Sequence, residues 1–288
     1  MGNRLERCIT LVAHDGIILD SSYFLFYYID MDIVPLFKTH YSIGKSILTL
    51  QSPDNLQEGG PSSVIDLCID AGLKQVVLVE DNLHGLLEAK KRCEENDLQL
   101  IFGFRLSLCS EYIDPSDKAA LKKEQLHKVI VFANNDNGVR KLYKIYSDAF
   151  CNHGGKLTTQ DLKKYWTKRD LTLAIPFYDS FLYMNNFKLD ARFMPDFSFS
   201  DPIFFVEDNG LPFDGLLQDI VNSFTSERGY KKQAAKSIFY RNKKDFKSYQ
   251  TFKIITSRSF SKRASFSAPN LDDCASDEFC MESWLNDN

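Results

Sequence analysis

Short apolar runs alternate along the chain with longer stretches in which apolar residues recur every three or four positions. The runs are typical of strands buried on both faces, and the periodic stretches are typical of amphipathic helices. The expected strands lie at residues 9–13, 76–79, 98–108, 128–133, 171–175, 203–207 and 234–240. This alternation predicts an α/β fold built on a parallel sheet with right-handed βαβ connections, either open or closed into a barrel.

The clearest expected helix lies between Pro61 and Gly72. Its apolar residues Val64, Leu67 and Cys68 recur at helical spacing, while Pro61 and Gly72 are a common start and stop. The same periodicity predicts helices within residues 84–96, 137–150 and 211–224. In both sheets and barrels of this class, functional groups gather at the carboxyl ends of the strands.

Composition excludes several classes of protein. A chain of 288 residues with a formal charge of −4 and a pI near 5.8 carries no uniformly basic surface for nucleic acid, so any DNA contact must be local. The seven cysteines are scattered singly without a C-x-x-C pair, which is typical of reduced thiols in the cytoplasm. No apolar run reaches the roughly 18 residues of a membrane span.

Candidate chemistry stands at the expected strand ends. Glu80 and Asp81 follow one strand, Arg105 lies within the next, His127 precedes a third, and Glu207 ends a fourth. Carboxylates and imidazole are metal ligands by type, but the spacing of these residues matches no known metal motif. Taken singly, each is better explained as a solvated loop charge or a satisfied histidine than as a metal ligand. The chain also lacks G-x-S-x-G and G-x-G-x-x-G, so it shows no sign of a serine nucleophile or a dinucleotide site.

Residues 44–46 read Gly-Lys-Ser, the end of a phosphate-binding P-loop. A P-loop requires a glycine five positions earlier, where backbone N–H groups curl around the phosphate, and that position is Thr39. The tripeptide is therefore expected to be a turn with a solvated lysine.

The order of segments resembles the N-terminal PHP (polymerase and histidinol phosphatase) domain of bacterial DNA polymerase III alpha subunits. The resemblance runs from about Val34 to the end of the chain, and residues 132–145, FANNDNGVRKLYKI, are its most specific piece. It implies an α/β fold, a distorted (β/α)7 barrel over residues 34–288. Residues 1–33 are an N-terminal extension, and their alternating pattern around an Asp-Gly pair predicts a β-hairpin. Residues 48–61 are expected to form an inserted surface loop.

In that family the barrel holds a cluster of metal ions for phosphoester hydrolysis. The resemblance places several of the family's ligand positions on residues that have lost ligand character, namely Leu36, Lys38, Arg105, Ser237 and Phe239. The remnant ligand candidates are Glu80, Asp81, His127 and Glu207. Thr39, Tyr41 and Ser42 match a T-x-Y-S pattern that follows the family's first metal motif.

Lys38 and Arg105 bring positive charge to positions where the family holds a divalent cation, and like charges repel strongly at short distance. We therefore expect no catalytic metal cluster and no cofactor, whereas a reduced working site would need Mn²⁺ or Zn²⁺. Lys38 and Arg105 are expected to form ion pairs with Glu80 and Glu207 inside the barrel.

These observations favour a non-catalytic PHP-like module of DNA replication, which docks to a DNA polymerase or a proofreading exonuclease. Because the family's polymerase palm lies downstream of the PHP domain, such a module is either a stand-alone protein or one piece of a split polymerase III alpha subunit. One alternative is a metal-dependent phosphoesterase or 3′–5′ exonuclease with a reduced site. Another is a viral or mobile-element mimic that binds host replication proteins.

The tail over residues 257–288 is basic and then acidic. Arg258, Lys262 and Arg263 alternate with Phe260, a composition suited to phosphate contact and base stacking. The acidic residues that follow would repel DNA, so a solvated loop is the competing interpretation. Residues 163–169, KKYWTKR, offer a similar and equally local candidate.

Overall fold

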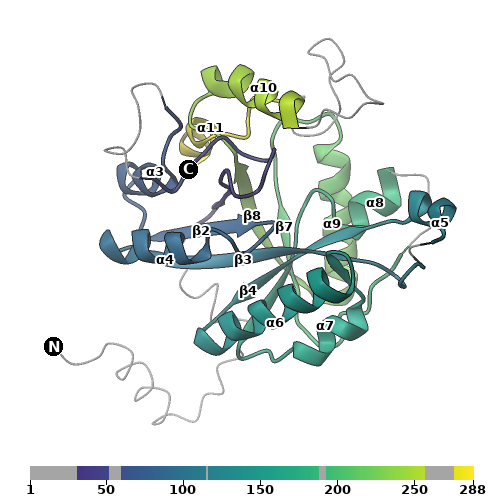
Figure 1. Ribbon diagram of the computed structural model, residues 1–288. Helices are drawn as coiled ribbons and strands as arrows, with labels where there is room; N and C mark the ends of the chain where they lie inside the picture. The colour runs from purple at the N-terminus through teal and green to yellow at the C-terminus, as the bar shows by residue number, and fades with distance from the viewer. Residues whose placement is uncertain (1–30, 52–59, 115, 188–192, 257–275) are drawn as a thin grey trace, which may run out of the picture.

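The computed structural model describes residues 31–51, 60–114, 116–187, 193–256 and 276–288 (Figure 1). Within this part, seven strands close a barrel in the order β2-β1-β8-β7-β6-β4-β3, and β2 pairs with β3 to complete the ring. The barrel strands are β1 (Val34–Phe37), β2 (Gln75–Glu80), β3 (Gln99–Leu108), β4 (His127–Ala133), β6 (Leu171–Ile175), β7 (Ile203–Val206) and β8 (Lys231–Ile238). A short strand, β5 (Lys156–Leu157), pairs with β3 outside the ring. The expected α/β barrel is confirmed, while the predicted N-terminal hairpin falls almost wholly outside the described residues.

Strand β4 runs against its neighbours. It pairs antiparallel with both β3 and β6, whereas the other barrel pairs are parallel, so the prediction of a parallel sheet throughout is wrong at this strand. The reason is the connection from β3, which contains only the short helix α5 (Lys118–Lys123) and returns at the same end of the barrel. The reversal pairs His127, at the start of β4, with Leu108, at the end of β3.

Helices cover the outside of the barrel (Figure 1). The four expected from periodicity are confirmed as α3 (Val64–Asp70), α4 (Leu86–Glu95), α6 (Asp136–Asn152) and α9 (Asp214–Arg228). The remaining ones are α7 (Thr159–Tyr165), α8 (Phe181–Phe187), the 3-10 turn η2 (Lys243–Asp245), α10 (Phe246–Thr256) and α11 (Met281–Asp287). None of the helices in the described segments is long and apolar enough to cross a membrane.

The Asn-rich segment at the end of β4 builds the start of α6. Asn135 is the N-cap residue, and its side-chain oxygen accepts a hydrogen bond of 2.9 Å from the Gly138 amide. Asn134 holds the segment against Asp170, whose carbonyl accepts from the Asn134 amide at 2.9 Å. A Cβ at Gly138 would lie 2.1 Å from the Asp170 carbonyl oxygen, so only glycine fits. The segment that resembles the family most closely therefore has a structural role, at the carboxyl end of the reversed strand.

Alternation along the strands separates two apolar cores. Residues facing the barrel interior, such as Val79, Ile101 and Phe132, form a small cluster inside the ring. Residues of the opposite parity, such as Leu78 and Val131, pack against the surrounding helices in the main core. The interior is thus filled with apolar side chains over part of its length, and polar side chains gather beyond them at the strand ends.

A third cluster fixes the C-terminal segment to the barrel. It contains the aromatic residues Phe239, Tyr240, Tyr249 and Phe279. The Phe239 amide donates to the Phe279 carbonyl at 3.0 Å. The Trp284 indole of α11 donates to the Ile33 carbonyl at 2.9 Å, beside the start of β1. These contacts place Phe239, Phe279 and α10 at the same end of the barrel as the polar strand ends.

The described cysteines, Cys68, Cys93, Cys109, Cys151 and Cys280, are free thiols, which is what their scattered spacing predicts. Burial raises the pKa of the Cys93 thiol to about 12 and that of Cys109 to about 11. Both are neutral core residues and take no part in the chemistry considered below.

Candidate functional site

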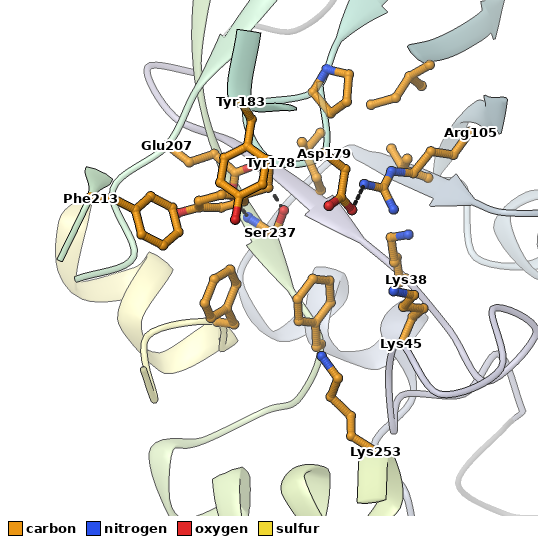
Figure 2. Close-up of a pocket in the computed structure, with 16 residues that line it drawn as sticks. Lys38, Lys45, Arg105, Tyr178, Asp179, Tyr183, Glu207, Phe213, Ser237 and Lys253 are labelled. Atoms are coloured by element: carbon orange, nitrogen blue, oxygen red, sulfur yellow. Dashed lines mark hydrogen bonds and ion pairs between the residues drawn. The ribbon is translucent and has the colours of Figure 1, made fainter. Parts of the chain in front are cut away.

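A cavity of about 130 Å³ opens at the carboxyl ends of the parallel strands (Figure 2). All five positions at which the resemblance places lost metal ligands line it, namely Leu36, Lys38, Arg105, Ser237 and Phe239. Its charged lining residues are Lys38, Lys45, Arg105, Lys253, Asp179 and Glu207. Residues from both ends of the described chain therefore converge on one site.

Two buried cations occupy one side of this cavity. Lys38 follows β1 and is 6% exposed, and Arg105 lies in β3 and is 9% exposed. The Lys38 ammonium lies 3.2 Å from a carboxylate oxygen of Asp81, and an Arg105 guanidinium nitrogen lies 3.6 Å from the other oxygen. Arg105 also donates to Asp179 at 2.8 Å (Figure 2). The two cations thus share Asp81, and Arg105 has a second carboxylate.

The charges of this network shift the pKa values of its members. Burial alone would raise the pKa of Asp81, but Lys38 and Arg105 hold it well below its usual range. Burial lowers the pKa of Lys38 to about 8, and repulsion from Arg105 adds to that decrease. Asp81 is therefore a carboxylate at neutral pH, and Lys38 is still mostly protonated.

The prediction that Lys38 and Arg105 form ion pairs with Glu80 and Glu207 is wrong in its partners, because Asp81 and Asp179 take that role. The pleat of β2 explains the difference at Glu80. Val77 and Val79 face the barrel interior, so Asp81 follows them inward and Glu80 has the opposite parity.

Glu80 instead holds the turn that follows β1. Its carboxylate accepts hydrogen bonds from the Thr39 amide at 2.8 Å, from the Thr39 hydroxyl at 2.6 Å, and from the Ser42 hydroxyl. The Tyr41 hydroxyl donates to Glu88 of α4. The T-x-Y-S residues therefore tie this turn to β2 and α4. Burial raises the pKa of Glu80 to about 7, although the Ser42 and Thr39 hydrogen bonds oppose the shift.

The expected turn lies at residues 43–45, with Gly44 at a φ of +74°. The expectation of a solvated lysine is wrong, because Lys45 is half-buried and lines the cavity. No helix begins directly after Ser46 in the described residues 46–51, so the loop and helix of a P-loop are not present here. Ser46 is a buried structural residue, and its hydroxyl donates to the Phe239 carbonyl at 2.9 Å.

Glu207 is held by neutral groups. It accepts hydrogen bonds from the Ser237 amide at 2.8 Å, from the Ser237 hydroxyl at 3.0 Å, and from the Asn209 amide group at 2.9 Å. Burial raises its pKa, and the Ser237 and Asn209 hydrogen bonds oppose that change. Ser237, at which the resemblance places a lost metal ligand, thus donates hydrogen bonds to a neighbouring carboxylate.

His127 lies away from the cavity. It has the same parity in β4 as Val129 and Val131, which pack against the outer helices, and its ring stacks on Phe193 with centroids 4.8 Å apart. Neither ring nitrogen has a partner among the described residues. Burial lowers the pKa of His127 to about 4, so the imidazole is neutral at pH 7. The inward residue at this end of β4 is Lys128, which donates to the Ser107 hydroxyl at 2.7 Å.

The residues at the mouth do not fit a divalent metal cluster. No group of three or more His, Cys, Asp or Glu side chains is arranged to hold a metal in the part of the chain that the structure describes. The Lys38 ammonium forms an ion pair with Asp81. The carboxylates of Glu80 and Glu207 already accept hydrogen bonds from neighbouring residues. Protein cations and hydroxyl groups thus satisfy the carboxylates that a metal would need.

Several site residues are not singled out by the sequence. Asp179, Lys45 and Lys253 line the cavity, together with an aromatic wall that includes Tyr178, Tyr183 and Phe213 (Figure 2). Asp179 lies four residues beyond the last residue of β6, and this position after a strand is the signal that could have found it. The nucleic-acid candidates Arg258, Phe260, Lys262 and Arg263 lie outside the described residues, as does most of the expected loop at 48–61.

We predict that Arg105→Glu destabilises the fold by about 3–5 kcal/mol, because it removes the buried cation between Asp81 and Asp179 and puts a third carboxylate beside them. Urea denaturation monitored by circular dichroism measures the change. Arg140→Glu, at an exposed position of α6, is the matched charge reversal and should shift stability by less than about 0.5 kcal/mol. Equal effects of the two variants would show that the Arg105 network does not stabilise the barrel.

A second prediction concerns pH. The folded protein keeps the proton of Glu80 up to about pH 7, whereas the unfolded chain releases it near the ordinary value of 4.5. Stability is therefore fully present below pH 4.5 and falls as the pH rises through 7, by on the order of 3 kcal/mol. Glu80→Gln cannot lose a proton, so its unfolding free energy should fall less between pH 5 and pH 8 than that of the wild type. Parallel pH curves for the two proteins would contradict the assignment.

Comparison with known proteins matches part of this chain to one family. The model of the PHP domain family matches residues 58–183, which is less than half of the chain. A crystal structure from Bifidobacterium adolescentis, named a "putative metal-dependent phosphoesterase", shares 11% sequence identity and a TM-score of 0.39, and the match covers 70% of this chain and 86% of that one. At that level the likeness carries no inference about function. No curated protein matches the sequence. Residues 58–183 thus match a PHP domain within a (β/α)7-type barrel.

Proposed function

We propose that this chain is a non-catalytic PHP-like module of DNA replication, which docks to a DNA polymerase or a proofreading exonuclease. The observation that carries the non-catalytic part is the placement of Lys38 and Arg105 in the cavity at the strand ends, where both cations bind Asp81. A divalent cation at this place would be repelled by both side chains.

The other groups at the site do not supply an alternative to a metal. Hydrolysis of a phosphoester needs an activated water and a group that stabilises the leaving oxygen. Glu80 has a pKa suited to a general base, but it is fully buried beneath the turn after β1. Glu207 faces the cavity with its oxygens bound to Ser237 and Asn209, and His127 lies on the far side of β4.

The docking part of the proposal rests on the resemblance of the whole segment order to the PHP domain of polymerase III alpha subunits. In some polymerase III alpha subunits the domain serves as a docking platform for the proofreading exonuclease, a role that needs the surface of the barrel and no metal. The match of residues 58–183 to the PHP domain model supports the fold that such a platform requires. The chain would act either by itself or as one piece of a split polymerase.

A metal-dependent phosphoesterase or 3′–5′ exonuclease is the second candidate. It is favoured by one observation, which is that Glu80, Asp81 and Glu207 are retained at the carboxyl ends of β2 and β7. Rearrangement of Lys38 and of the Ser237 hydrogen bonds would be needed before these carboxylates could share a metal.

Elemental analysis and a cleavage assay decide between the two candidates. We expect the purified protein to hold less than one equivalent of zinc or manganese, and to leave single-stranded DNA uncut in the presence of added Mn²⁺. A known metal-dependent nuclease serves as the positive control. Several equivalents of metal, with cleavage that Glu207→Gln abolishes, would establish the phosphoesterase and overturn the non-catalytic assignment.

The docking role is tested by pull-down of separately purified polymerase and exonuclease subunits from the same source. We expect a stable complex with one of them, and the complex should persist in EDTA because no metal is needed to form it. Arg140→Glu serves as a folded variant with altered surface charge, to separate specific docking from electrostatic adhesion. If the protein stays monomeric and binds neither subunit, the docking role is wrong. That result would not bear on the proposal that the protein is non-catalytic.

A further inference from the structure

The most exposed large apolar side chains of the described residues gather around one turn. Ile43, Leu87 and Ile255 are 79%, 72% and 59% exposed, more than any other large apolar residue in the described ranges. Ile43 lies in the turn after β1, Leu87 in the first turn of α4, and Ile255 near the end of α10. We call these three residues the apolar patch.

Close packing brings the three segments together. A Cβ at Gly44 would lie 2.6 Å from the Thr256 hydroxyl oxygen, so the turn touches the end of α10 beside Ile255. A Cβ at Gly85 would lie 2.6 Å from the Tyr41 ring, so the same turn touches the start of α4. The apolar patch is therefore built by neighbouring segments, and none of its three residues lines the cavity described above.

The turn that carries Ile43 is held in place by the residues before it. Tyr41 donates a hydrogen bond to Glu88 of α4, and Ser42 donates one to Glu80 at the end of β2. A side chain on a turn that is already ordered costs little conformational entropy when a partner binds. Exposed apolar side chains that cluster in this way are typical of a contact with another protein.

Positive charge surrounds the apolar patch. The segments that form it span residues 39–46, 85–91 and 246–256, and their charged residues are Lys45, Lys90, Lys91, Lys247, Lys253 and Glu88. Glu88 is the one carboxylate among them, and it accepts the hydrogen bond from Tyr41. Lys90 and Lys91 form only long, exposed ion pairs within α4, at 3.9 Å and 3.8 Å, which neutralise them weakly. This surface is thus locally cationic in a chain whose formal charge is −4.

The complement of such a surface is an apolar segment flanked by aspartate or glutamate. Opposite charges on two proteins speed their association and set the orientation in which they meet. An anionic lipid surface is a poorer match, because no Phe, Tyr or Trp side chain of these three segments is exposed. Surfaces that insert into a membrane interface are rich in exposed aromatic residues.

We propose that the apolar patch is the surface on which the replication partner docks, and that it binds an apolar segment of that protein flanked by acidic residues. This inference rests on the docking role proposed above and names the part of the barrel that carries it. The contact lies beside the cavity and needs no ligand inside it.

Binding measurements with the purified polymerase and exonuclease subunits test the patch, by biolayer interferometry on the full-length protein. We expect Ile43→Asp and Leu87→Asp each to weaken the complex at least about tenfold, because each puts a carboxylate into an apolar contact. Leu216→Asp is the matched control and should bind like the wild type. Leu216 is 57% exposed and also lies in the first turn of a helix, α9. Circular dichroism checks that all three variants are folded.

The charge of the partner is tested separately. Lys247→Glu, at an exposed position of α10, should slow association several-fold. Lys144→Glu, exposed on α6, is its matched charge reversal and should leave the association rate unchanged. Added salt should slow association of the wild type and reduce its difference from Lys247→Glu, because salt screens exposed charges.

Two results would overturn this inference and leave the docking role standing. One is a complex that Ile43→Asp and Leu87→Asp form as tightly as the wild type, which places the partner elsewhere. The other is equal weakening by Leu216→Asp, which shows that the contact is not specific to the apolar patch. The absence of a complex with either subunit would overturn the docking role and this inference together.

Other occupants of the apolar patch would also overturn the inference. A dimer of this chain, detected by light scattering and dissociated by Ile43→Asp, would assign the patch to self-association. Sedimentation with vesicles of phosphatidylserine and phosphatidylcholine, abolished by Ile43→Asp, would assign it to a membrane surface.

Discussion

The site depends on one interaction, which is the partly buried carboxylate of Asp81 shared by the Lys38 ammonium and the Arg105 guanidinium. It links three strands of the barrel, because Lys38 follows β1, Asp81 follows β2 and Arg105 lies in β3. Removing Asp81 would leave the buried Lys38 ammonium without its carboxylate, and the loss of one partner from a buried ion pair costs several kcal/mol. The same interaction places two cations in the cavity at the strand ends, where they would repel a divalent cation.

Much of the fold follows from local pattern, and the exceptions have physical reasons. Strands 76–79 and 171–175 were recognisable because continuous apolar runs suit a barrel strand that is buried on both faces. Strand β1 escaped recognition as a strand from its pattern because it is short and contains Pro35. The antiparallel direction of β4 could not be predicted from its sequence either, because strand direction is set by the connection from β3 and not by the residues of the strand itself.

The site was predicted in its residues better than in its contacts. The resemblance placed Lys38, Arg105 and Ser237 at lost ligand positions, and all three line one cavity. The carboxylate partners of Lys38 and Arg105 were not predicted correctly, although the alternation of side chains along each strand indicates which residues face the barrel interior. Asp81 has the same parity as Val77 and Val79, so it faces the barrel interior, whereas Glu80 does not. His127 has the same parity as Val129, so it faces the outer helices. Lys45 and Lys253 come from a turn and a helix far apart in the sequence, and only the folded chain brings them together.

A double-mutant cycle on Lys38 and Asp81 measures most directly whether a protein cation has taken over the structural role of a metal. The unfolding free energies of the wild type, Lys38→Met, Asp81→Asn and the double variant give the coupling between the two side chains. At a separation of 3.2 Å, with both groups largely buried, we expect a favourable coupling above about 1 kcal/mol, independent of EDTA. A coupling indistinguishable from zero, or stability of the wild type that rises markedly with added Mn²⁺ or Zn²⁺, would contradict the replacement of metal by internal ion pairs.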